Sequence, residues 1–264
     1  MHPVVLRWGP FSVYAYTAAV SLGIMVAVAY VHWRGSLSGF SVTYLLDGAL
    51  WTIAGGIVGA RLAYVLAHRE DFSGGILDLW SRWDGGLVFQ GGLLGGLVVL
   101  YLYSVYTQVS ALRLVDLAAP AVALAQALGW AGALLHGANY GLIMRSPISM
   151  WLPDLYGVYG PRIPTQLLGS FLGLGLFYTL HRASCSQHRP GLLGLLYVFG
   201  NGVGHFLLGF ARSDQALYVG MLRSTQLAEL VEASVAGSCL SICWWFRRYR
   251  ANTSAQTDGT DGDA

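Results

Sequence analysis

Six charged or titratable side chains interrupt stretches of this sequence that are otherwise apolar: Asp47, Arg61, Asp116, His136, His205 and Arg212. A charged side chain at bilayer depth costs at least about 2.5 kcal/mol, so each such residue needs a partner, a water-filled cavity or a function. Arginine can hold a phosphate through bidentate, charge-assisted hydrogen bonds. The pattern therefore favours a polar cavity, walled by the second, fourth and sixth helices, in which arginines bind a phosphate.

A structural role is the alternative for the same residues. Asp47 and Arg61 lie fourteen residues apart in one predicted helix, about 21 Å along its axis, so they cannot pair with each other. Arg61 could pair with Asp116 or another acid instead. A buried histidine is also commonly a hydrogen-bonded core residue rather than a catalyst.

Glycines form a second pattern, with small residues spaced to let helices approach closely. Three groups of glycines show it: Gly55, Gly56 and Gly59; Gly91, Gly92, Gly95 and Gly96; Gly200, Gly202 and Gly204. Near the start of a predicted helix, the pairs Gly85-Gly86 and Gly91-Gly92 flank the polar Gln90. Backbone N–H groups exposed at such a helix start could approach an anionic headgroup.

These residues fall on, or directly beside, seven apolar stretches that are each long enough to cross a bilayer, which takes about 20 residues. The stretches are residues 11–33, 44–67, 86–106, 114–136, 164–181, 191–211 and 225–246. Of 264 residues, 55% are hydrophobic and 11% are charged, against roughly a quarter charged in soluble domains. We expect an all-α membrane protein of about seven transmembrane helices, with a single transmembrane domain over residues 1–250.

The connecting segments differ in character. Residues 68–84 are too polar to cross the bilayer, and Trp80 and Trp83 suit an interfacial segment between the second and third helices. A longer loop, residues 137–163, joins the fourth and fifth helices. The polar tail, residues 251–264, is rich in Thr, Gly and Asp and is expected to be disordered.

Charge and cysteine content limit the orientation, the partners and the metals that the chain can have. The basic cluster Arg247, Arg248 and Arg250 follows the last span and places the C-terminus in the cytoplasm and the N-terminus outside. The net charge of +2 gives no patch for nucleic acid. Of the three cysteines, Cys239 and Cys243 lie four residues apart in an apolar stretch with no histidine near them in sequence, so we expect no metal site.

The motifs, taken in order, resemble those of the prolipoprotein diacylglyceryl transferases, bacterial inner-membrane enzymes of seven helices. The resemblance runs from His2 to about Gln226. It rests on His2-Pro3, Gly9-Pro10, Tyr16, Gly59-Ala60-Arg61-Leu62-Ala63-Tyr64, Trp83-Asp84-Gly85-Gly86, Phe89-Gln90-Gly91-Gly92, Asp116, Pro120, Arg162-Ile163-Pro164-Thr165-Gln166-Leu167, Gly202-Val203-Gly204-His205-Phe206, Arg212 and Gln226.

The resemblance implies transfer of a diacylglyceryl group from phosphatidylglycerol to the lipobox cysteine thiol of a prolipoprotein. Such a reaction needs a thiolate nucleophile and cations for the phosphate leaving group. It implies no metal or organic cofactor. On this hypothesis His205 or His136 is the base, and the phospholipid is bound by Arg61, Arg162, Arg212, Tyr16, Tyr64, Asp116, Gln166 and Gln90.

The sequence also departs from the family pattern. The fourth-helix motif Gly-Arg-x-Gly-Asn-Phe-x-Asn-Gly-Glu-x-x-Gly keeps its four glycines between Gly129 and Gly141. Its Arg, two Asn and Glu are replaced by Trp130, Ala133, His136 and Ala138. The usual third-helix His is Gln90, and in the sixth helix the usual Arg and Glu are His205 and Gly209.

Two other functions stay open at this point. The chain could be an inactive relative that binds a lipid or a lipoprotein, or assists another membrane protein. A transporter has less support, because the halves show no repeat and no pair of short broken helices.

Overall fold

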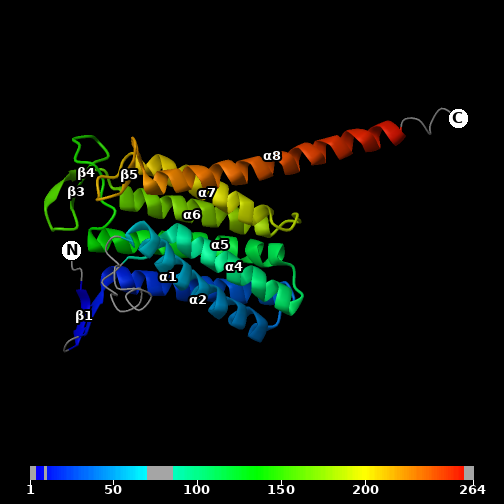
Figure 1. The fold of residues 1–264 in the computed structure, drawn as a ribbon, viewed down its shortest axis with the longest axis horizontal. Helices are drawn as coiled ribbons and strands as arrows, with labels where there is room; N and C mark the ends of the chain where they lie inside the picture. Colours follow the sequence, from blue (N-terminus) through cyan, green and yellow to red (C-terminus); the bar gives the residue numbers. More distant parts are fainter. Residues whose placement is uncertain (1–3, 9–10, 70–85, 259–264) are drawn as a thin grey trace.

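The structure, a computed structural model, describes residues 4–8, 11–69 and 86–258. Most of these residues form one bundle of helices (Figure 1), which confirms the predicted all-α membrane fold. The helices are α1 (Ala15–Leu37), α2 (Val42–Ala67), α4 (Phe89–Thr107), α5 (Ala111–His136), α6 (Thr165–Ser184), α7 (Leu192–Gly209) and α8 (Ser224–Asp258). Three antiparallel hairpins accompany them: β1 (Val4–Trp8) with β2 (Phe11–Tyr14), β3 (Met150–Pro153) with β4 (Tyr159–Arg162), and β5 (Tyr218–Val219) with β6 (Leu222–Arg223).

Most of these helices suit a membrane by length and composition. Within the described residues, six of them, all but α6, are long and apolar enough to span a bilayer. The remaining helix, α6, packs between α5 and α7. The chain is therefore a multi-pass membrane protein.

The structure corrects the predicted elements at both ends. Phe11–Tyr14 is strand β2, so the first helix begins at Ala15 rather than Phe11. The two strands, VVLRW and FSVY, consist mainly of β-branched and aromatic residues, which suits a strand. At the other end α8 continues to Asp258, into the segment expected to be a disordered tail. This extension contains no Gly or Pro, and the first glycine after the span, Gly259, follows directly. Residues 259–264 lie outside the described residues, as does nearly all of the predicted interfacial segment, residues 68–84.

The glycine groups bring α2 and α4 into close contact, as predicted. A Cβ added to Gly59 would lie 2.8 Å from the Cα of Gly95 and would collide with the carbonyl oxygen of Gly91. A Cβ added to Gly95 would likewise collide with the carbonyl oxygen of Gly55. The chain also contacts itself extensively between α1 and α5, α5 and α6, and α7 and α8.

The alternating helix directions give the bundle two different ends. Helices α1, α4, α6 and α8 begin, and α2, α5 and α7 finish, at the end that carries the hairpins; we call it the hairpin end (Figure 1). The opposite end holds the short turns after α1, α4 and α6. Helix α8 extends beyond the bundle there.

Candidate functional site: a polar cavity at the hairpin end

A cavity of about 460 Å³ lies among α1, α4, α5, α7 and α8, with further lining from the segments after α5 and α7. Its polar lining residues are Tyr16, Gln90, Gln126, Asn139, Asn201, His205, Arg212, Thr225 and Glu229. The predicted fourth and sixth helices correspond to α5 and α7, and both line this cavity as expected. The predicted contribution of the second helix is wrong, because no described residue of α2 lines this cavity; α1, α4 and α8 complete the wall instead.

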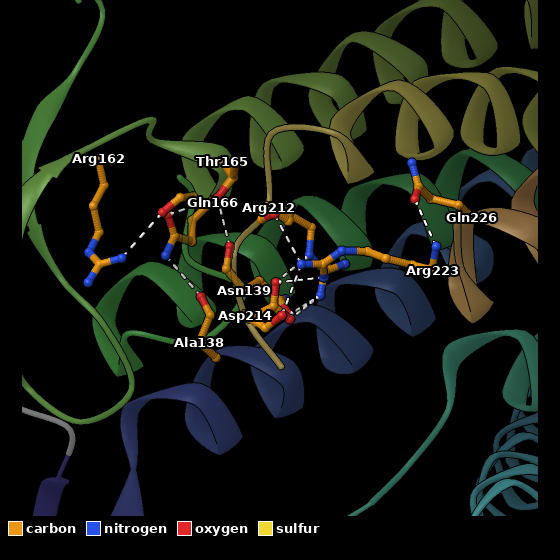
Figure 2. A network of polar contacts seen from close by, with 10 residues as sticks. Ala138, Asn139, Arg162, Thr165, Gln166, Arg212, Asp214, Arg223 and Gln226 are labelled. Atoms are coloured by element: carbon orange, nitrogen blue, oxygen red, sulfur yellow. Dashed lines mark hydrogen bonds and ion pairs between the residues drawn. The ribbon is translucent and has the colours of Figure 1, made fainter. Parts of the chain in front are cut away.

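Arg212 is the cation on the cavity wall, held by two neighbours (Figure 2). Its Nε and Nη2 donate to the two carboxylate oxygens of Asp214, at 2.9 and 2.7 Å, and Nη2 also donates to Asn139 Oδ1 at 2.9 Å. Its guanidinium carbon lies 5.7 Å from the centre of the Trp130 ring. No described residue accepts a hydrogen bond from Nη1, so this nitrogen can donate to a ligand.

A second arginine holds the same carboxylate from the side of α8. Arg223 Nη1 donates to Asp214 at 3.0 Å, and its Nη2 donates to the backbone carbonyls of Arg212 and Asp214. Gln226 accepts from the backbone N–H of Arg223 and donates to the carbonyl of Phe206 in α7. The network fixes the chain after α7 and therefore the position of Arg212.

The two arginines also determine the charge of Asp214. Its carboxylate is largely buried, and burial alone would raise its pKa. Hydrogen bonds and positive charge from Arg212 and Arg223 outweigh this effect and hold the pKa of Asp214 below its ordinary value. The carboxylate therefore stays charged and keeps both arginines in place at neutral pH.

Asn139 is positioned by the start of α6. Thr165 Oγ1 donates to the Asn139 carbonyl at 2.7 Å, and Gln166 Nε2 donates to the Ala138 carbonyl at 2.9 Å (Figure 2). Arg162 stabilises the adjacent hairpin through Asp154 at 2.9 Å and lies 4.8 Å from the Tyr140 ring. Gln166 and Arg162, both predicted to bind the phospholipid, are thus nearly fully buried and hold the loop behind the cavity instead of lining it.

His205, the predicted base, does line the cavity. Its Nε2 lies 3.0 Å from Gln126 Nε2, and Gln126 Oε1 accepts from the Tyr197 hydroxyl at 3.1 Å. With the amide assigned this way, Nε2 of His205 is the acceptor. The imidazole also stacks on Trp130, with ring centres 5.2 Å apart. Positions 130 and 205, where the family pattern has arginines, thus hold a stacked Trp–His pair.

Tyr16 and Gln90, also predicted site residues, line the cavity from α1 and α4. Arg61 and Tyr64 lie close to its edge but outside its lining. Arg61 is 2% exposed, and its Nη1 lies 3.4 Å from the carbonyl oxygen of Gly86. Gly86 immediately precedes Leu87, a lining residue.

Two predicted residues lie elsewhere. His136, at the last turn of α5, packs against the rings of Tyr14 and Tyr16 rather than in the lining. Asp116 lies at the opposite end of the bundle, about 30 Å from His136 along the axis of α5. Its oxygens accept from the backbone N–H groups of Gly191 and Gly194, so it caps the start of α7.

The predictions missed three residues of this region. Asn139 and Asp214 hold Arg212, and Glu229 lines the cavity from α8. Glu229 stands in an apolar predicted span, which is the same signal that selected Asp116, so the sequence could have identified it. Asp214 stands two residues from Arg212, but this spacing alone does not show that they pair.

An apolar cavity of about 210 Å³ adjoins the polar one. It lies among α1, α2, α4 and α5, and Ile24, Val122 and Ala125 line both cavities. Its walls are almost entirely apolar side chains, such as Leu45 and Leu117. The two cavities together suit an amphipathic ligand, with a polar group beside Arg212 and an apolar group deeper in the bundle.

Fold and site thus define a multi-pass helical membrane protein with an arginine-bearing cavity suited to an amphipathic anion. The chain belongs to the prolipoprotein diacylglyceryl transferase family, whose family model matches residues 3–246. A phosphatidylglycerol–prolipoprotein diacylglyceryl transferase of Clostridium tetani is 30% identical over 87% of this chain and 93% of its own. Relatives with the same name from Gloeobacter violaceus and Halalkalibacterium halodurans are 29% and 26% identical, covering 96% and 93% of this chain and 96% and 86% of their own.

Proposed function

We propose that this protein transfers the diacylglyceryl group of phosphatidylglycerol to the lipobox cysteine thiol of prolipoproteins, in the bacterial inner membrane. Family membership supports this reaction, and the names of the relatives supply both substrates. The single observation that carries the proposal is the pair of adjoining cavities that share lining residues, one with an arginine and the other apolar. Phosphatidylglycerol has the matching division into an anionic phosphate and acyl chains.

Arg212 is the proposed phosphate ligand. Its Nε and Nη2 are occupied by Asp214 and Asn139, which leaves Nη1 to donate to a phosphate oxygen. A fixed guanidinium stabilises the charge that develops on the leaving phosphate without having to reorganise during the reaction. Tyr16 and Gln90 provide hydrogen-bonding groups on the neighbouring walls.

The apolar cavity provides a place for part of an acyl chain. Burial of apolar surface there stabilises the bound lipid by roughly 25 cal/mol per Å². With the chain seated in this cavity, the glycerol carbon that bears the phosphate would lie near the boundary with the polar cavity. The thiol would then enter from the hairpin end, where Arg212 lies.

The test measures thioether formation between phosphatidylglycerol in micelles and a lipobox peptide, followed by mass spectrometry. We expect product with the purified protein, and a loss of about 100-fold in rate for Arg212→Lys, because lysine keeps the charge but loses the fixed fork. Arg145→Lys is the matched control, since Arg145 is exposed in the loop after α5. If the unaltered protein forms no product, the proposed transfer is wrong and the chain is better explained as an inactive relative that binds a lipid.

A further inference from the structure

Glu229 is an acidic side chain buried in the wall of the polar cavity. It lies one turn after Gln226 in α8 and is 5% exposed. Its Oε2 is buried and accepts no hydrogen bond from any described residue, although Glu229 lines the cavity. A carboxylate at membrane depth is costly, so one kept without a hydrogen-bonding partner beside a cavity indicates a functional role.

Other groups around the cavity leave this carboxylate available. Arg212 directs its Nε and Nη2 to Asp214 and Asn139. His205 is also occupied, because its Nε2 accepts from Gln126 and its ring stacks on Trp130. His136, the other predicted base, is not part of the lining.

Building on the function proposed above, we propose that Glu229 is the catalytic base that takes the proton from the lipobox thiol. The S–H proton passes to the Glu229 carboxylate. The thiolate attacks the carbon of the diacylglyceryl group that bears the phosphate. The C–S bond forms as the C–O bond breaks, and the electron pair of that bond leaves on glycerol phosphate beside Arg212. The proton then passes from Glu229 to water or to the leaving phosphate, so the carboxylate is restored.

Asn201 supports this position. Its side chain is buried, lines the same cavity from α7, and leaves Oδ1 without a hydrogen bond from any residue in the described part of the chain. The cavity wall thus presents two oxygen acceptors, from Glu229 and Asn201, beside the donor groups of Arg212. The oxygen acceptors would bind the proton of the thiol, and the donor groups of Arg212 would bind the phosphate.

The chain provides a matched control within one turn of α8. Glu232 is also an acid with a buried Oε2 that no described residue hydrogen-bonds, but it does not line the cavity. We therefore expect Glu229→Gln to lower the rate of thioether formation by about 100-fold or more, the range of general-base catalysis. Glu232→Gln should leave the rate unchanged, and Glu229→Asp should retain part of the activity because it keeps a carboxylate.

His205→Ala separates the two candidate bases. If Glu229 is the base, His205→Ala lowers the rate far less than Glu229→Gln does. A larger loss of rate in His205→Ala than in Glu229→Gln would identify His205 as the base and overturn the proposal. Equal losses in Glu229→Gln and Glu232→Gln would show only a structural role for buried acids in α8, and would also overturn the proposal.

A second readout does not depend on turnover. The rate at which iodoacetamide alkylates the thiol of bound lipobox peptide, without phosphatidylglycerol, reports how much thiolate forms. We expect the rate to fall in Glu229→Gln and to stay unchanged in Glu232→Gln. A fully active Glu229→Gln overturns the role of Glu229 while the proposed transfer stands. A protein that neither transfers lipid nor binds the peptide overturns both.

Discussion

One carboxylate, that of Asp214, organises the charged residues at the hairpin end. It accepts from Arg212 and Arg223, and these arginines come from the two sides of the segment that joins α7 to α8. Salt bridges that are shielded from water matter far more than exposed ones, because loss of one partner leaves the other charge uncompensated. The position of the proposed phosphate ligand therefore depends on a residue that does not line the cavity.

Replacement of this carboxylate should change how stability depends on pH. The folded-state pKa of Asp214 lies below the value of about 3.9 for a free Asp, so its stabilisation is full above that value and declines as pH falls through the folded pKa. Asp214→Asn should lose at least about 2 kcal/mol at neutral pH. The measurement is the unfolding temperature in detergent against pH, and the difference from the unaltered protein should shrink in acid.

Asp47→Asn is the control for this experiment, because Asp47 is exposed near the start of α2 and far from the network. It should leave the unfolding temperature unchanged at each pH. A difference between Asp214→Asn and the unaltered protein that stayed constant down to strong acid would contradict the role given to the two arginines.

At the scale of elements, the contact of α2 with α4 depends on missing side chains. Gly55 and Gly59 lie against Gly91 and Gly95, so the two backbones approach closely. Helix α4 begins at Phe89, beside the cavity residues Leu87, Val88 and Gln90. The same glycines that join two helices therefore also set the position of one cavity wall.

We expect Gly59→Ala to destabilise the protein, because the new methyl group would collide with the carbonyl of Gly91; overpacking of this kind costs about 1–3 kcal/mol. Gly175→Ala is the matched control, since a Cβ at this helical position in α6 meets no described atom within 4 Å. It should be neutral or stabilising, because Ala favours a helix over Gly by about 1 kcal/mol. The measurement is the thermal unfolding of the two variants in detergent. Equal changes in the unfolding temperature of Gly59→Ala and Gly175→Ala would argue against the close contact between α2 and α4.

At the scale of the whole molecule, the two ends of the bundle differ in chemistry. The hairpin end holds the cavity, the arginine network and the three hairpins. The opposite end holds Asp116, which caps α7, and the exposed Cys185 that follows α6. From the basic cluster after the last span we expect this opposite end to lie in the cytoplasm, and under the proposed function the cavity would then open to the other side of the membrane.

Cysteine labelling tests this orientation. In a chain with Cys239→Ser and Cys243→Ser, we expect an impermeant maleimide to leave Cys185 unmodified in intact cells and to modify it after permeabilisation. A further chain that also carries Cys185→Ser and Arg145→Cys places a thiol in the loop at the hairpin end and should react in intact cells. Reaction of Cys185 before permeabilisation would reverse the orientation.

The sequence by itself determined the helical membrane fold, the close contact of glycine-rich helices and the family. These features depend on apolar length, small-residue spacing and motif order, all of which are local or sequential properties. It also identified Arg212, His205, Tyr16 and Gln90, which the structure brings to one cavity. Arg212 and His205 stand out as polar residues in or beside apolar spans, whereas Tyr16 and Gln90 were identified through the family resemblance.

Only the tertiary structure decided how these residues are divided among roles. Asp116 and Arg212 look alike in the sequence as charged residues near spans, but alternating helix directions place them at opposite ends of the bundle. Arg162 and Gln166 became supports of the loop rather than parts of the lining, because their partners come from other segments. Whether Glu229 lines a cavity or the lipid depends on how α8 rotates against α7, and that rotation is set by packing between helices.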